Sequence, residues 1–93
     1  MKKLSIVIPA YNEGATIHFI LNKVKDVQLV NNIEKEVIIV NDCSKDNTEE
    51  AIQNYMAQNP DLNIQYHKHE VNQGKGAALH TGISKATGEY LII

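Results

Sequence analysis

The chain has 93 residues, of which 43% are hydrophobic and 22% are charged, and its formal net charge is −2. This composition is ordinary for a globular protein and argues against disorder, and the small net charge predicts no nucleic-acid partner. The single cysteine, Cys43, excludes an internal disulfide and a zinc site built from cysteines. The first apolar run ends at Pro9, too early for a signal peptide, and no run could span a bilayer, so we expect a soluble, cytoplasmic chain.

Apolar periodicity alternates along the chain between the two-residue repeat of strands and the 3.6-residue repeat of helices. Residues 4–8 predict a buried strand. An apolar helix face follows, formed by Ile17, Ile20, Leu21 and Val24. Residues 36–40 (EVIIV) are almost entirely apolar, which is typical of a parallel strand covered on both faces.

The second half of the chain continues the alternation. Asp46, with Glu49 three residues later, predicts a capping box at the start of a second helix. Residues 62–69 (LNIQYHKH) mix apolar and polar side chains, which indicates a strand near the sheet edge. A loop and helix over residues 74–87 then precede a further strand over residues 89–93. Together these elements predict an α/β fold with an open, parallel, Rossmann-like sheet and helices on both faces.

In such sheets ligands bind beyond the carboxyl ends of the strands. Polar segments follow the predicted strands at residues 9–13 (PAYNE), 41–48 (NDCSKDNT) and 69–78 (HEVNQGKGAA). Asp42 lies too close to its strand to cap the next helix, so its carboxylate is available to a base or a sugar. Ser44, like Asp46, is more typical of a helix cap.

The glycine-rich segment before the last predicted helix contains Lys75, and its glycines would let the backbone approach an anion. It matches neither the Walker motif nor the dinucleotide-binding motif. Gly82 and the two alanines Ala77 and Ala78 are better explained by close packing of the helix on the sheet. The histidines do not group at a metal-binding spacing, and we expect them to be solvated.

Three segments together resemble the family 2 glycosyltransferases, in order and in spacing: residues 5–13 (SIVIPAYNE), 36–48 (EVIIVNDCSKDNT) and 72–93 (NQGKGAALHTGISKATGEYLII). The resemblance is nearest to dolichyl-phosphate mannose synthase and related polyprenyl-phosphate sugar transferases. It implies a GT-A fold and an enzyme that transfers a hexose from a nucleotide-diphosphate sugar to an acceptor such as a polyprenyl phosphate. It also implies a nucleotide-sugar pocket lined by Pro9, Ala10, Tyr11, Glu13, Val40, Asp42 and Lys75.

Two residues differ from the commonest form of the family's motif after the strand predicted over residues 36–40, which is Asp-Asp-Gly-Ser. Asn41 replaces the first aspartate and Cys43 replaces the glycine, while Asp42 keeps its place. Because left-handed backbone favours glycine, Cys43 predicts that this conformation is absent here.

The resemblance further implies that the metal-binding Asp-x-Asp motif, the catalytic base and the acceptor-binding segments lie beyond Ile93. We therefore expect residues 1–93 to be the nucleotide-sugar-binding part of a glycosyltransferase domain, truncated before that motif, without metal ligands or catalytic residues of its own. The full-length enzyme would use Mg²⁺ or Mn²⁺, and the missing part would place it at the cytoplasmic face of a membrane.

Two other function classes stay open. A non-catalytic nucleotide-binding or regulatory module would share the fold but would have no metal ligands or base downstream. A phospho-receiver domain needs an acidic pair after the first strand and a phosphorylatable aspartate after the third. This chain has Tyr11-Asn12-Glu13 and residues 67–70 (HKHE) at those places, which argues against a receiver.

Overall fold

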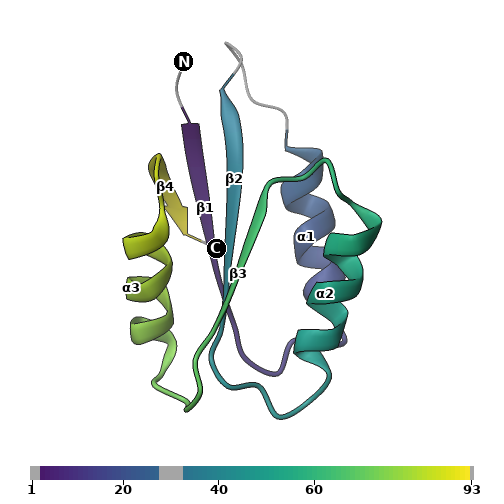
Figure 1. Ribbon diagram of the computed structural model, residues 1–93, viewed down its shortest axis with the longest axis vertical. Coiled ribbons are helices and arrows are strands. Elements are labelled where there is room, and N and C mark those ends of the chain that lie inside the picture. The colour runs from purple at the N-terminus through teal and green to yellow at the C-terminus, as the bar shows by residue number, and fades with distance from the viewer. Residues whose placement is uncertain (1–2, 28–32, 93) are drawn as a thin grey trace.

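The computed structural model describes residues 3–27 and 33–92 of the chain. Within these residues strands and helices alternate (Figure 1). The strands are β1 (Lys3–Ala10), β2 (Glu34–Asn41), β3 (Ile64–Lys68) and β4 (Glu89–Ile92). The helices are α1 (Ile17–Asp26), α2 (Thr48–Gln58) and α3 (Lys75–Lys85).

The described strands form one parallel sheet with the order β3-β2-β1-β4. The central pair, β1 and β2, is in register from Lys3 opposite Glu34 to Ala10 opposite Asn41. β3 lies at an edge, as its mixed polar pattern predicts. Because the strands are parallel, their carboxyl ends all meet at one edge of the sheet, which is the lower edge in Figure 1.

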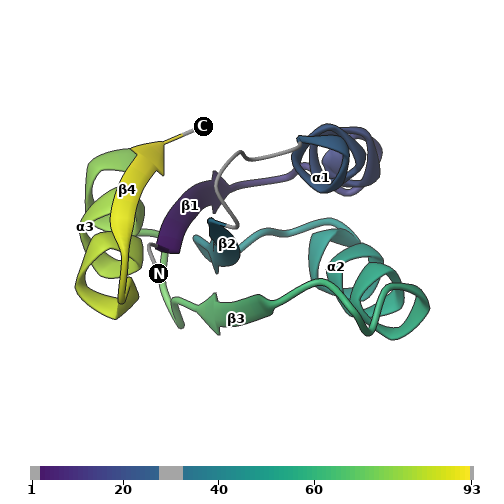
Figure 2. The same cartoon turned by 90° about the horizontal axis from the view of Figure 1, so that it is seen from above.

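Helices cover both faces of the sheet, so the predicted fold class is confirmed. α1 and α2 lie on one side and α3 lies on the other (Figure 2). Alternate residues of β2 serve the two sides: Val37 and Ile39 pack into the core beneath α1 and α2, whereas Ile38 and Val40 pack against Ala78 of α3. This arrangement explains why residues 36–40 carry almost no polar position.

α3 approaches the sheet closely at Gly82. A Cβ atom placed on Gly82 would lie 2.3 Å from Cγ1 of Val7 on β1. The glycine is therefore a packing requirement of the helix–sheet contact, as the sequence predicts.

A buried polar cluster joins the strands at the opposite, amino edge of the sheet. Glu36 is 2% exposed, and its carboxylate accepts hydrogen bonds from the Thr87 hydroxyl at 2.6 Å and the Thr87 N–H at 3.3 Å. Lys3 Nζ lies 3.5 Å from the same carboxylate, and Ser5 Oγ lies 3.4 Å from it. The cluster connects β1, β2 and the segment before β4, so it stabilises the edge that is distant from the candidate site.

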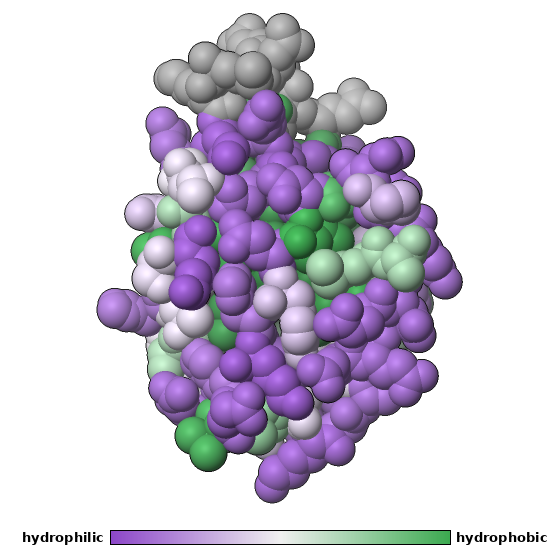
Figure 3. All heavy atoms as spheres, in the orientation of Figure 1, coloured by the Kyte–Doolittle hydropathy of each residue, from purple (hydrophilic) through white to green (hydrophobic). Residues whose placement is uncertain are grey.

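Most of the surface on the β3 side is hydrophilic, with apolar side chains confined to a smaller area (Figure 3). Among the helices of the described part of the chain, none has both the length and the apolar character required to cross a membrane.

Candidate functional site

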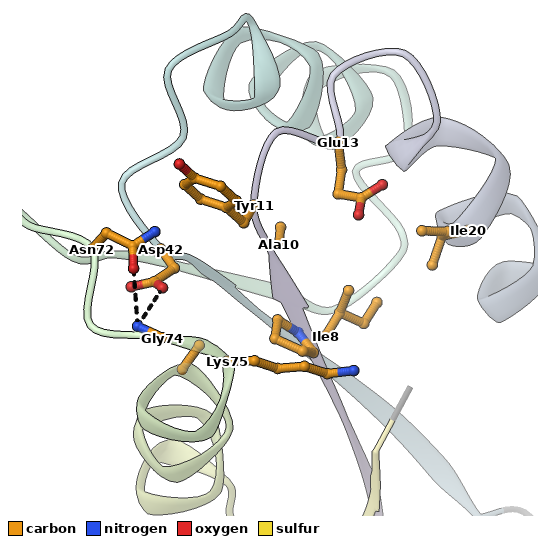
Figure 4. Close-up of a pocket in the computed structure, with 11 residues that line it drawn as sticks. Ile8, Ala10, Tyr11, Glu13, Ile20, Asp42, Asn72, Gly74 and Lys75 are labelled. Carbon is orange, nitrogen blue, oxygen red and sulfur yellow. Dashed lines mark hydrogen bonds between the residues drawn. The ribbon is translucent and has the colours of Figure 1, made fainter.

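The carboxyl edge of the sheet holds a cavity of about 470 Å³ (Figure 4). It is formed by the end of β1 and the turn after it, by α1, by the residue that follows β2, and by the start of α3 with the loop before it. Six of the seven residues predicted to form the site line it: Pro9, Ala10, Tyr11, Glu13, Asp42 and Lys75. The other lining residues are Ile8, Ile20, Asn72, Gly74 and Ala78. Residues far apart in the sequence thus converge on one pocket, as the position of the strand ends predicts.

Val40 is the exception, because it does not line this cavity, and its assignment to the nucleotide-sugar site stays a prediction. Its side chain is fully buried in the cluster with Ile38 and Ala78 and does not line the cavity. Side chains along a strand alternate between the two faces, and the Val40 side chain faces α3 from within the sheet. Val40 packs in one cluster with Ala78, which does line the pocket.

The turn after β1 is held against the turn after β2 by Asn12. Asn12 has a φ of 53°, in the left-handed region that asparagine tolerates better than most residues. Its backbone N–H donates to Ser44 Oγ at 2.9 Å, and its side-chain oxygen accepts from the Lys45 N–H at 2.8 Å. Asn12 therefore shapes the pocket wall by joining two loops, while its neighbour Tyr11 faces the cavity.

The same two loops are joined again at the start of α2. The Glu13 N–H donates to Thr48 Oγ1 at 2.8 Å, and the Gly14 N–H donates to Asp46 Oδ2 at 3.1 Å. The predicted capping box is wrong: the N-cap is Asn47, and it makes no side-chain cap hydrogen bond. The Asp46 carboxylate instead accepts hydrogen bonds from the Gly14 N–H, in the loop after β1, and from the Thr48 N–H, at the first residue of α2.

Cys43 also differs from the prediction. Its φ is 59°, so the chain adopts left-handed backbone there although glycine is absent. The residue lies between Asp42, which turns into the pocket region, and Ser44, which contacts the first loop. Cys43 Sγ lies 3.4 Å from the Glu70 carbonyl oxygen, so the tertiary contacts on both sides hold a conformation that is costly for a residue with a Cβ.

Asp42 anchors the loop that leads into α3. The residue is only 3% exposed, and its carboxylate accepts hydrogen bonds from the Gln73 N–H at 2.9 Å and the Gly74 N–H at 2.8 Å. Burial by itself raises the pKa of the Asp42 carboxyl, but the hydrogen bonds from Gln73, His69 and Gly74 outweigh it and hold the pKa below its usual range. Asp42 is therefore a carboxylate at neutral pH.

His69 is the functional candidate that the sequence did not reveal. It was expected to be solvated, yet it is 9% exposed, with Nδ1 2.8 Å from Asp42 Oδ1 and Nε2 2.9 Å from Thr81 Oγ1. Its position directly after β3 brings it beside Asp42, which follows the neighbouring strand. Neither partner is close to His69 in the sequence, so no local motif signals the contact.

The pocket is lined by an aromatic ring, two acidic side chains and a lysine, together with the apolar residues Ile8, Pro9 and Ala10 at the end of β1. Tyr11 is 42% exposed and lies between Asp42 and Glu13 in Figure 4. Glu13 Oε2 accepts a hydrogen bond from Thr16 at 2.6 Å, which holds its carboxylate in place. Lys75 lies on the α3 side of the pocket, at the first turn of that helix. Such a site can hold a flat ring, accept hydrogen bonds from hydroxyl groups and attract an anion.

The residues of this pocket do not fit a divalent metal ion. Over residues 3–27 and 33–92, no three His, Cys, Asp or Glu side chains group in a way that could hold one. Asp42 already accepts hydrogen bonds from three protein donors. No step of the chemistry is therefore assigned to a metal held by these residues.

The chain is similar in sequence to known glycosyltransferases. The chain is 33% identical to a dolichyl-phosphate beta-glucosyltransferase of Dictyostelium discoideum and 34% identical to a prophage bactoprenol glucosyl transferase homolog of Escherichia coli. In both cases the match covers 97% of this chain but only 29% of the relative.

Solved structures agree in fold. The mannosyltransferase PcManGT of Pyrobaculum calidifontis, in complex with GDP-Man and Mn²⁺, matches 91% of this chain and 24% of its own, with a TM-score of 0.84 and 28% identity. TarS of S. aureus, in complex with UDP-GlcNAc, matches 100% of this chain and 26% of its own, with a TM-score of 0.84 and 30% identity. These neighbours support the predicted GT-A architecture. The family model of glycosyl transferase family 2 matches residues 5–93, and the chain belongs to that family.

Proposed function

We propose that the pocket at the carboxyl edge binds the nucleotide part of a nucleotide-diphosphate sugar, and that residues 1–93 form the donor-binding part of a glycosyltransferase. The observation that carries the proposal is the convergence of Tyr11, Glu13, Asp42 and Lys75 on one cavity. Membership of glycosyl transferase family 2 supports it.

Each side chain has a chemistry that suits one part of such a ligand. The Tyr11 ring can stack on the base or pack against the ribose, and Asp42 can accept a hydrogen bond from a base N–H. Glu13 can accept hydrogen bonds from the ribose hydroxyls. Lys75 supplies the positive charge that a diphosphate requires. Pro9 and Ala10 form the apolar surface beneath the nucleoside.

The full reaction that we propose is transfer of a hexose from the nucleotide sugar to a polyprenyl phosphate. The names of the relatives, which act on dolichyl phosphate and bactoprenol, support this acceptor. The Mn²⁺ in the PcManGT complex supports a divalent metal at the donor diphosphate. Because the pocket residues do not offer a metal site, we assign the metal ligands and the catalytic base to segments outside this chain, which would act at the cytoplasmic face of a membrane.

A second candidate is a nucleotide-binding or regulatory module without transferase activity. It is favoured by one observation, the lack of any group of three potential metal ligands in the part of the chain that the structure describes. Both candidates require nucleotide binding, so they differ only in turnover once metal ligands and a base are supplied.

Nucleotide binding can be tested by NMR with the ¹⁵N-labelled chain and either UDP or GDP at millimolar concentration. We expect shift changes confined to the turns after β1 and β2 and the start of α3. Tyr11→Ala should weaken binding at least about fivefold, because stacking of a base on an aromatic ring contributes ~1–3 kcal/mol. Tyr90→Ala is the matched control: Tyr90 is an exposed tyrosine on β4, paired with Ser5 far from the pocket.

A well-folded chain whose spectrum is unchanged by both nucleotides would contradict the proposed function. Equal weakening by Tyr11→Ala and Tyr90→Ala would contradict the assignment of Tyr11 to the binding site.

A further inference from the structure

His69 is a buried polar side chain beside the pocket that the proposed function does not use. It does not line the cavity, but it bridges two elements that do: Asp42 after β2 on one side and Thr81 of α3 on the other. Its backbone N–H also donates to the Asn41 carbonyl at 2.9 Å, which fixes the start of the loop next to β2. The ring is thus held at both of its nitrogens, and the backbone of the residue is held at a third point.

The arrangement of protons in this bridge follows from Asp42. An ionised carboxylate only accepts hydrogen bonds, so the proton of the 2.8 Å contact lies on Nδ1 of His69. Nε2 faces the Thr81 hydroxyl at 2.9 Å, and a hydroxyl can serve it as donor or as acceptor. The bridge is satisfied whether the ring is neutral or charged.

His69 also determines which acceptor positions of Asp42 are left for a ligand. Oδ1 accepts from His69 Nδ1 and from the Gln73 N–H, and Oδ2 accepts from the Gly74 N–H. A carboxylate offers about four acceptor positions, two on each oxygen. One position therefore remains on Oδ2, and Asp42 lines the pocket.

We propose that His69 is a positioning residue for nucleotide binding. It does not touch the ligand: it holds Asp42 in the orientation that fixes the Gln73 and Gly74 N–H groups and directs one remaining acceptor position toward the pocket. Thr81 holds the ring in turn and so links this orientation to α3, on which Lys75 lies. The ligand part of this inference rests on the proposed function, whereas the effect on the loop can be measured without any ligand.

The loop effect is tested by amide hydrogen exchange on the ¹⁵N-labelled chain. In His69→Leu we expect the Gln73 and Gly74 amides to exchange about tenfold faster or more, with the amides of β1 and β2 unchanged. His69→Asn should restore most of the protection, because its amide N–H₂ occupies the place of the Nδ1 donor. Thr81→Val should give an intermediate increase, and His67→Asn, on the preceding strand, should give none.

Unchanged exchange at Gln73 and Gly74 in both His69→Leu and Thr81→Val would overturn the proposal. A uniform rise over the whole chain would also overturn it, because it would show that His69 only contributes to global stability. If His69→Leu does not fold, His69→Asn is compared with Thr81→Val. His69→Asn keeps a donor to Asp42, whereas Thr81→Val removes the hydrogen-bond partner of the His69 ring, so we expect faster exchange of Gln73 and Gly74 in Thr81→Val. Equal exchange in these two variants would overturn the proposal.

The ligand part is tested by a double-mutant cycle with UDP and GDP. We expect His69→Leu to weaken binding of the tighter-binding nucleotide at least about fivefold. In the Asp42→Asn background it should cause no further loss of affinity, since the effect passes through Asp42. Equal affinity of the wild type and His69→Leu would overturn the inference and leave the proposed function intact. Failure of the wild type to bind either nucleotide would refute the proposed function, and the exchange experiment would then decide the role of His69 alone.

Discussion

The carboxylate of Asp42 has more partners within the protein than its place at a binding pocket would suggest. Three donors reach it, from His69, Gln73 and Gly74, and two of them share Oδ1. A base with a single N–H on its pairing edge, such as uracil, can use the remaining position on Oδ2. Guanine presents two adjacent donors on that edge, and both cannot be accepted at once.

We therefore expect UDP to bind this chain more tightly than GDP, by about fivefold, which corresponds to one unmade hydrogen bond of ~1 kcal/mol. The measurement is a pair of calorimetric or NMR titrations under identical buffer and salt conditions. UMP and GMP serve as controls for the diphosphate, since the preference should persist without the second phosphate. Tighter binding of GDP would contradict the count of acceptor positions on Asp42.

At the scale of the elements, α3 offers a direct comparison of two glycines on one helix. A Cβ at Gly82 would lie 2.3 Å from Val7 Cγ1 and 3.5 Å from Val40 Cγ2, whereas a Cβ at Gly76 would meet nothing within 4 Å. Replacing glycine by alanine in a helix gains up to ~1 kcal/mol from helix propensity. Overpacking of a well-filled core costs ~1–3 kcal/mol.

We expect Gly82→Ala to lower the free energy of unfolding by about 1–2 kcal/mol and Gly76→Ala to raise it by about 0.5–1 kcal/mol. Urea unfolding followed by circular dichroism measures both. Only Gly82 faces β1 at close range, so a loss of stability in Gly82→Ala that is absent from Gly76→Ala reports the contact of α3 with β1. Equal stability of the two variants would show that α3 can move away from the sheet without cost.

The elements themselves were predictable because their signals are local. The strand predicted over residues 4–8 and the apolar stripe that begins at Ile17 depend on neighbours within a few positions, and the structure contains both elements. The loops depend on distant partners. The buried contact of His69 with Asp42 and the engagement of Asp46 by Gly14 each join residues about thirty positions apart, so neither leaves a pattern in the sequence.

The same distinction explains the outcome at the site. Pro9 and Ala10 are the last residues of β1, Tyr11 and Glu13 follow it, and Asp42 follows β2. Parallel strands bring these positions together at one edge of the sheet, independently of the loop conformations. The side of the sheet that Val40 faces depends on register and on α3, which the family resemblance does not resolve. The left-handed backbone at Cys43 was missed for a related reason, because tertiary contacts can impose a conformation that local preference disfavours.

At the scale of the whole molecule, a buried carboxylate lies at each end of the sheet. Glu36 lies at the amino edge and Asp42 at the carboxyl edge. Burial alone raises the pKa of the Glu36 carboxyl, but the hydrogen bonds from Thr87 and the charge of Lys3 hold it below its usual value. A pKa that is lower in the folded state adds stability above the unfolded pKa of ~4.3, and this contribution is lost as the pH falls through the folded value.

We expect Glu36→Gln to destabilise the chain at pH 7 by about 1–3 kcal/mol, as for other buried hydrogen-bonded charges, and to differ less from the wild type as the pH falls below 4. Thermal melts at pH 7, 5, 4 and 3 measure the difference. Glu34→Gln is the matched control, since Glu34 is an exposed glutamate on the same strand. A constant difference between Glu36→Gln and the wild type at all pH values would contradict the linkage to the Glu36 charge.

Nucleotide-sugar binding and catalysis are expected to be separable in this chain. We expect residues 1–93 alone to bind a nucleotide sugar but to form no glycosylated lipid, because their described residues bring no metal-ligand group to the pocket. Loss of charge stabilisation at the leaving diphosphate typically costs several kcal/mol in the transition state. The test incubates the chain with Mn²⁺ or Mg²⁺, UDP-hexoses and GDP-hexoses, and a polyprenyl phosphate, beside a full-length bactoprenol glucosyl transferase as the positive control. Product formed at a rate near that of the control would show that this chain holds its own catalytic groups, and would refute their assignment to segments outside it.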